Sequence, residues 1–149
     1  MYALDNGRFS TAAACVGIAQ ACIDAATKYV LERKQFGKTI GSFQLVQEMI
    51  ADMVVETEAA RLLVWEVGHL KNRGKPIVKH ASMAKYYASE VALRAAKSAI
   101  HCHGGYGFSD EYPVERYYRD AMGLSLYEGT AQIQKMIIGR ETLGIPAFV

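Results

Sequence analysis

This chain of 149 residues has little proline, cysteine or net charge, and each shortage excludes a class of protein. Its three prolines leave long stretches free to form helices. A net charge of +2, dispersed along the chain, argues against nucleic acid as a partner. No apolar run approaches the roughly 20 residues that a membrane helix needs, so no membrane span is expected. Three cysteines without the spacing of a disulfide framework indicate reduced thiols in a reducing compartment.

What the chain does contain is helical periodicity over nearly its whole length. Hydrophobic residues make up 51% of it, which suits a single domain, residues 1–149, with a real core. Because nothing alternates with period two, the sequence predicts an all-α fold, an antiparallel helical bundle. The first helix is expected over residues 9–34. The second starts at the N-cap Ser42 and ends before a break at 72–76. Three more are expected over residues 77–102, 113–120 and 130–143.

Three of these helices have a face that should be buried. The second carries an apolar stripe at spacings of three and four: Val46, Ile50, Met53, Thr57, Ala60, Val64 and Val67. The third carries a seam of small residues, which allows close helix packing: Ala81, Ala84, Ala88, Ala92, Ala95 and Ala99. The last is expected to point four side chains inward: Ile133, Met136, Ile137 and Leu143.

Glu128 lies between an expected loop and the last helix and has two interpretations. As a carboxylate at a helix start, it would be stabilised by the helix macrodipole. As a general base, it would act beside the aromatic Tyr127 and the flexible Gly129. The pattern alone favours the first interpretation.

Two other segments are open to a structural and a functional interpretation. Arg33, at the end of the first helix, either neutralises the helix dipole before a stop at Gly37 or contacts a phosphate, with Phe36 offering a surface to a ring. The glycines at 104, 105 and 107 form either a tight turn or a close backbone approach to a ligand. No strand precedes them, so they are not a dinucleotide fingerprint.

No metal site is expected. Glu66 and His69 match one half of a di-iron bundle site, but the second Glu-x-x-His copy is missing. The run His101-Cys102-His103 lacks the ligand spacing of structural zinc. No serine or cysteine has a motif for nucleophilic catalysis around it.

Three segments in order and in register resemble one family. They are YVLERKQFGK at 29–38, HGGYGF at 103–108 followed by EYPVER at 111–116, and YEGTAQIQ at 127–134. Together they resemble the C-terminal helical domain of flavin-dependent acyl-CoA dehydrogenases, over essentially the whole chain. The resemblance implies an antiparallel four-helix bundle. A full subunit of that family also has an N-terminal helical domain and a middle β-domain, which are expected to be absent from this chain.

The resemblance implies roles for particular residues. Glu128 matches the catalytic base, while Asp5, Arg8 and Gly129 match positions that line the acyl-CoA site. Contacts to FAD, many of them to the FAD of a neighbouring subunit, are implied for Arg33, Gln35, Phe36, Phe43, Gln44, His101, Gly104, Gly105, Thr130 and Gln132. His101 stands where many relatives have Gln, which makes that contact a departure from the family pattern.

The implied reaction is the α,β-dehydrogenation of an acyl-CoA thioester to the trans-2-enoyl-CoA. Its implied partners are the acyl-CoA substrate, an electron-transfer flavoprotein and further subunits of a homotetramer. The expected location is the cytoplasm, or the mitochondrial matrix in a eukaryote. Two alternatives remain: an isolated bundle that acts only as a structural or oligomerisation module, and part of an acyl-CoA oxidase that uses oxygen directly.

Overall fold

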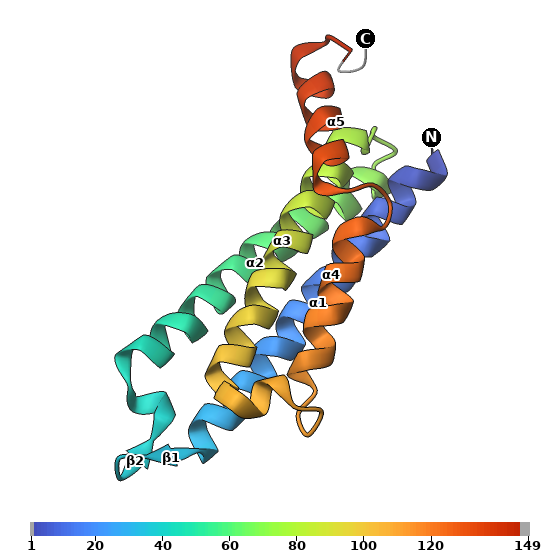
Figure 1. Ribbon diagram of the computed structural model, residues 1–149. Coiled ribbons are helices and arrows are strands. Elements are labelled where there is room, and N and C mark those ends of the chain that lie inside the picture. The colour runs from blue at the N-terminus through green and yellow to red at the C-terminus, as the bar shows by residue number, and fades with distance from the viewer. Residues whose placement is uncertain (1, 147–149) are drawn as a thin grey trace.

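The computed structural model describes residues 2–146 and is built almost entirely from helices (Figure 1). In chain order its elements are α1 (Tyr2–Glu32), β1 (Lys34–Gln35), β2 (Lys38–Thr39), the 3-10 helix η1 (Ile40–Ser42), α2 (Gln44–Asn72), α3 (Val78–His103), the 3-10 helix η2 (Gly104–Phe108), α4 (Val114–Leu126) and α5 (Ala131–Leu143).

Helix α3 is the centre of the molecule, because it packs against α1, α2, α4 and α5. The first four helices lie side by side as a bundle, and α5 continues past its upper end, near the N-terminus (Figure 1). The predicted all-α helical bundle is therefore confirmed. The α-helices in residues 2–146 number five, because α5 adds one to the four of the bundle.

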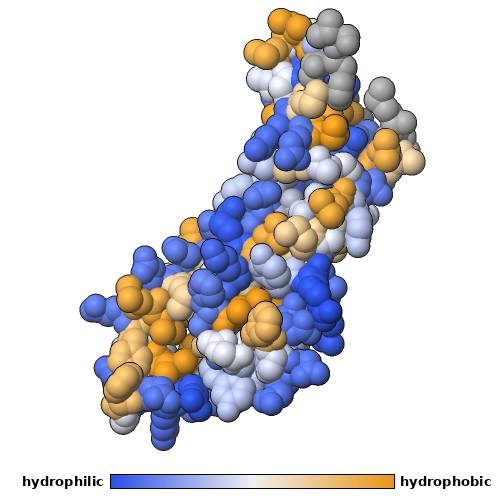
Figure 2. Space-filling view, in the orientation of Figure 1, coloured by the Kyte–Doolittle hydropathy of each residue, from blue (hydrophilic) through white to orange (hydrophobic). Residues whose placement is uncertain are grey.

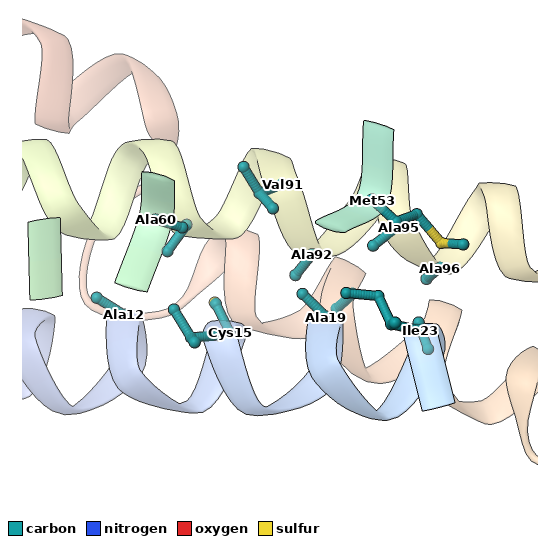
Figure 3. Packing of buried hydrophobic residues seen from close by; sticks show 14 of the residues in the cluster. Ala12, Cys15, Ala19, Ile23, Met53, Ala60, Val91, Ala92, Ala95 and Ala96 are labelled. Atoms are coloured by element: carbon teal, nitrogen blue, oxygen red, sulfur yellow. The ribbon is translucent and has the colours of Figure 1, made fainter. Parts of the chain in front are cut away.

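The core consists mainly of small side chains from α1 and α3 that face each other (Figure 3). Every alanine of the predicted α3 seam is buried, and Ala12, Cys15, Ala19 and Cys22 meet that seam from α1. Side chains of this size let the two helix backbones approach closely. The stripe on α2 is also confirmed, since Met53, Thr57, Ala60, Val64 and Val67 are buried and the remaining two members pack against the core.

Helix α1 is apolar over a longer stretch than the search for apolar runs in the sequence indicated. By length and composition alone, Ala3–Glu32 could cross a membrane. Its Ala12, Cys15 and Ala19, however, are the residues that pack on α3. Burial of this kind is what a core helix in a bundle shows.

The predicted boundaries of the first two helices are wrong at three points. Helix α1 begins at Tyr2 instead of residue 9, which places Asp5 and Arg8 one turn apart on a helix. It ends at Glu32, and residues 34–39 form a two-stranded antiparallel hairpin that was not predicted. Ser42 is not the N-cap of α2: its hydroxyl donates to Thr39 O at 2.7 Å, and Phe43 takes the cap position.

Two predictions for the C-terminal helices also need correction. The helix expected over residues 113–120 is longer than predicted, because α4 runs to Leu126 with Gly123 inside it. A Cβ at Gly123 would lie 2.8 Å from Tyr127 Oη, so this glycine makes room for the tyrosine ring rather than ending the helix. On α5, Leu143 is 71% exposed instead of inward, and the buried residues are Ile137 and Gln134.

Candidate functional site

The loop between α4 and α5 has an unusual backbone at Glu128. This residue has φ 56°, and Gly129, which follows it, has φ 96°. A non-glycine residue in the left-handed region costs free energy, of the order of 1 kcal/mol or more. Contacts from the rest of the fold must therefore hold Glu128 in this conformation, and positions held in this way are frequent at functional sites.

The Glu128 side chain projects toward α1, where Gly7 leaves space for it. A Cβ at residue 7 would lie 2.7 Å from Glu128 Oε1 and closer still to Oε2. Oε2 is buried and has no hydrogen-bond partner among the described residues. A carboxylate oxygen that no protein group satisfies remains available to accept a proton from a ligand. This geometry favours the interpretation of Glu128 as a base over its interpretation as a helix cap.

The substrate residues predicted from the resemblance surround this glutamate. Arg8 and Asp5 form a buried ion pair of 2.8 Å on the first turns of α1. The Nε of Arg8 also donates to the backbone oxygen of Glu128 at 3.4 Å. With Gly129 next in the chain, the structure brings all four predicted residues of the substrate and base group together.

Sequence reasoning missed two side chains that hold the same loop. Gln134 is fully buried on α5, and its Nε2 donates to Glu128 O at 2.9 Å and to Gly129 O at 3.0 Å. Lys85 is fully buried on α3 and donates to Ser125 O and Gly129 O. A signal for Lys85 existed, because it falls within the buried alanine seam, four residues after Ala81.

A second group of predicted residues lines a cavity of about 760 Å³ at the other end of the bundle. The members of the predicted flavin set that line it are Arg33, Gln35, Phe36, Phe43, His101, Gly104 and Gly105. They come from two segments that are distant in sequence: residues 33–43, around the hairpin and just before α2, and residues 101–105, at the end of α3 and the start of η2. The structure therefore gathers most of the predicted cofactor residues around one opening.

Aromatic rings, the Arg33 guanidinium and the Glu111 carboxylate all line this cavity. Tyr29 and His103 stack with ring centroids 4.2 Å apart, and Arg33 lies over the Tyr106 ring at 5.8 Å. Burial lowers the pKa of His103, against the hydrogen bond that it makes with Ala99 O. Aromatic side chains and an arginine suit a planar ring that carries phosphates.

Phe36 stands at the tip of the hairpin and is 90% exposed. It has φ 52° and Gly37 has φ 79°, so both central residues of the two-residue turn are left-handed, as a type I′ turn requires. Gly37 is thus left-handed, as expected, but within a hairpin instead of at a helix stop. The turn holds a large aromatic side chain out from the surface beside Phe43, whose ring centroid is 6.2 Å away.

The remaining predicted flavin residues do not line the cavity. Gln44 is exposed directly after Phe43, while Thr130 and Gln132 lie at the start of α5, next to Glu128. At about 1.5 Å per residue, the stretch of α3 from Lys85 to His101 is about 24 Å long. The predicted residues therefore form two sites near opposite ends of the bundle. Among residues 2–146, no group of three or more His, Cys, Asp or Glu side chains is arranged to hold a metal ion.

Comparisons with known proteins identify the family. The family described as "Acyl-CoA dehydrogenase, C-terminal domain" matches residues 1–143. The chain is 49% identical, over 96% of its length, to the probable acyl-CoA dehydrogenase YngJ of Bacillus subtilis. It is also 49% identical, over 93% of its length, to subunit CarC of the caffeyl-CoA reductase-Etf complex of Acetobacterium woodii.

Solved structures give the same result. Butyryl-CoA dehydrogenase from Megasphaera elsdenii superposes on 94% of the chain with a TM-score of 0.92 and 44% sequence identity. The chain covers 38% of YngJ, 36% of CarC and 37% of the butyryl-CoA dehydrogenase chain, so it spans just over a third of these proteins. The chain belongs to the acyl-CoA dehydrogenase family and carries its C-terminal domain.

Proposed function

We propose that this domain supplies the catalytic base and part of the flavin surface of an enzyme that dehydrogenates an acyl-CoA thioester to the trans-2-enoyl-CoA. The observation that carries the proposal is Glu128, whose buried Oε2 has no hydrogen-bond partner within residues 2–146 and faces Gly7. Two further observations support the same function. The chain belongs to the acyl-CoA dehydrogenase family, and Asp5, Arg8 and Gly129 lie beside Glu128.

Glu128 removes the α-proton of the thioester. That proton is weakly acidic, so its removal needs a base at hydrogen-bond distance and a donor for the negative charge that develops on the thioester oxygen. The backbone N–H of Glu128 is the chain's own donor for that oxygen. In the reverse direction, which the name of the CarC complex describes for that relative, the same carboxyl group returns the proton.

The two ends of the domain suit FAD as the cofactor. When bound, FAD would supply the acceptor for a hydride from the β-carbon. Arg33 would contact its phosphates, and the exposed glycine backbone at 104–105 would allow a close approach. Thr130 and Gln132 would contact flavin beside the base. The open cavity with its aromatic and cationic walls supports this fit.

Two groups of proposed flavin contacts near opposite ends of the bundle are best explained if they face the cofactors of two different subunits. The surface supports such an assembly. Apolar side chains gather over the hairpin and the first turns of α2, at the lower left of the molecule (Figure 2), where Leu31, Phe36 and Leu45 are exposed. The proposed assembly is a homotetramer, and the proposed electron acceptor is an electron-transfer flavoprotein in the cytoplasm or mitochondrial matrix.

The test is Glu128→Gln in the flavin-loaded protein, with the chain alone or joined to the remaining domains of the family's subunit. Loss of the proton acceptor should lower turnover of an acyl-CoA by about a thousandfold, while flavin absorbance stays unchanged. Glu141→Gln, on the exposed side of α5, is the matched control and should keep full turnover.

Undiminished turnover in Glu128→Gln would remove the glutamate from the mechanism. A colourless chain that ignores added FAD and only self-associates would instead favour the oligomerisation module. An oxidase would be recognised by reduced flavin that oxygen reoxidises within the catalytic cycle.

A further inference from the structure

Lys85 is a charged side chain in the least expected place in this molecule. It is 0% exposed and has alanines of the α3 seam on either side, at 81, 84 and 88. Lysine is almost never fully buried unless it is paired, because removing an ammonium group from water costs several kcal/mol or more. Its retention here calls for contacts that compensate for that cost.

Those contacts are two backbone carbonyls that bracket the catalytic glutamate. Lys85 Nζ donates to Ser125 O at 2.9 Å and to Gly129 O at 2.7 Å. Ser125 lies in the last turn of α4, where carbonyls have no partner within the helix. Gly129 directly follows Glu128. One ammonium group thus joins the end of α4 to the far side of the loop.

The charge of Lys85 is matched by dipoles rather than by a carboxylate. Among the described residues it forms no ion pair within 4.0 Å, although a cation at the C-terminus of α4 is favoured by the helix macrodipole. Burial lowers the pKa of Lys85, and the nearby charge of Arg8 acts in the same direction. Cys15, Glu90 and Glu128 act in the opposite direction.

The other donors to this loop hold its middle but not its start. Arg8 donates to Glu128 O, and Gln134 donates to Glu128 O and Gly129 O. Of these three side chains, Lys85 alone connects the loop to α4, from which the loop begins. Without that connection, Glu128 could relax from φ 56° to a less costly conformation.

We propose that Lys85 is a positioning residue for the base: its buried ammonium group ties the end of α4 to Gly129 and thereby fixes the Glu128 carboxylate where it meets the substrate. This inference rests on the proposed role of Glu128. It assigns to Lys85 no contact with substrate or flavin, so its effect on the reaction passes entirely through the loop.

The test replaces Lys85 by Met, which has a similar length but neither charge nor donor. Amide hydrogen exchange should accelerate at least tenfold in residues 125–134 and stay unchanged in α1 and α2. In the flavin-loaded protein, kcat should fall at least tenfold with KM altered less than twofold, because a misplaced base weakens only the transition state.

Ser89→Ala is the matched control. Ser89 is buried one turn away on α3, and its hydroxyl donates to Tyr86 O within the same helix, so this variant should exchange and turn over as the parent does. If Lys85→Met does not fold, Lys85→Gln keeps one donor for a carbonyl and should show the same local pattern.

If amide exchange became faster throughout the bundle in both Lys85→Met and Lys85→Gln, Lys85 would be a general core residue and the inference would be overturned. Unchanged exchange in residues 125–134 would overturn it as well. Because exchange is read without turnover, failure of this proposal is distinguishable from failure of the Glu128 assignment, which shows only in the kinetics of Glu128→Gln.

Discussion

Gly7 sets the position of the Glu128 carboxylate by having no side chain. The atoms that an added Cβ would meet belong to the far end of a flexible side chain, not to backbone. In Gly7→Ala the carboxylate should therefore move while helix α1 stays in place. Turnover of the flavin-loaded protein should fall at least tenfold, yet the free energy of unfolding, measured by urea denaturation, should not decrease.

Gly17→Ala is the control for this prediction, since a Cβ at Gly17 would meet nothing within 4 Å. It should raise the free energy of unfolding by about 0.5–1 kcal/mol, because alanine loses less conformational freedom in a helix than glycine does. Its turnover should match the parent. Parental turnover in Gly7→Ala would mean that the carboxylate works equally well from another position.

The thiols of the three cysteines should be unreactive in the folded protein. Burial raises the pKa of Cys15 to about 11, of Cys22 to about 12 and of Cys102 to about 11. At pH 8 the thiolate that reacts with alkylating reagents is then about a thousandth or less of each thiol. Iodoacetamide should label none of them in an hour at pH 8, and all of them after unfolding in urea. Labelling of the folded chain would disprove this protection.

The loop motif could be identified from the sequence, but the residues that support the loop could not. Glu128, Asp5, Arg8 and Gly129 could be grouped because their motifs resemble those of a known family. Gly7 and Gln134 could not, because what matters is the space or the donor that they present to a loop far away in the chain. Such contacts depend on how α1 and α5 dock, which periodicity does not specify.

At the scale of elements, the end of α3 should respond to acid through His103. Burial lowers its pKa from the ordinary value of 6.5, so below pH 6.5 the unfolded chain takes up a proton more readily than the folded one. The free energy of unfolding should therefore decrease as the pH falls from 7.5 to 5.5. Urea denaturation at both pH values measures this slope.

His103→Asn should lose most of the slope, because asparagine does not titrate, while its amide can still donate to Ala99 O. His69→Asn, on the exposed side of α2, should keep the slope of the parent. Equal slopes in the parent and in His103→Asn would assign the acid sensitivity to other groups.

Helices were easier to predict than the joints between them. The α2 stripe and the α3 seam repeat over many turns, so a single misread residue does not hide them. The hairpin is two residues per strand and rests on a left-handed Phe36, which propensity does not favour. The extension of α4 past Gly123 depends on where the Tyr127 ring packs, which is a tertiary fact.

At the scale of the whole molecule, α2 has a second apolar face that the bundle leaves uncovered. Val55, Leu62 and Trp65 are each more than 60% exposed. At 100° per residue, Val55 and Leu62 lie on the side opposite Met53 and Val64, and Trp65 lies on the flank between the two faces. Large exposed apolar residues on one helix face typically mark a protein interface. We therefore expect the chain to self-associate through α2, in line with the proposed assembly of several subunits.

Leu62→Lys combined with Val55→Lys should break that association, because each substitution would bury an unpaired ammonium group at the contact. Light scattering should report a mass several times that of one chain for the parent and that of one chain for the double variant, with unchanged helix content by circular dichroism. Leu126→Lys, an equally exposed leucine on α4, is the control and should keep the parental mass. If the double variant retained the parental mass, α2 would not be the contact, and the exposed hairpin end with Phe36 and Leu45 would be the surface to substitute next.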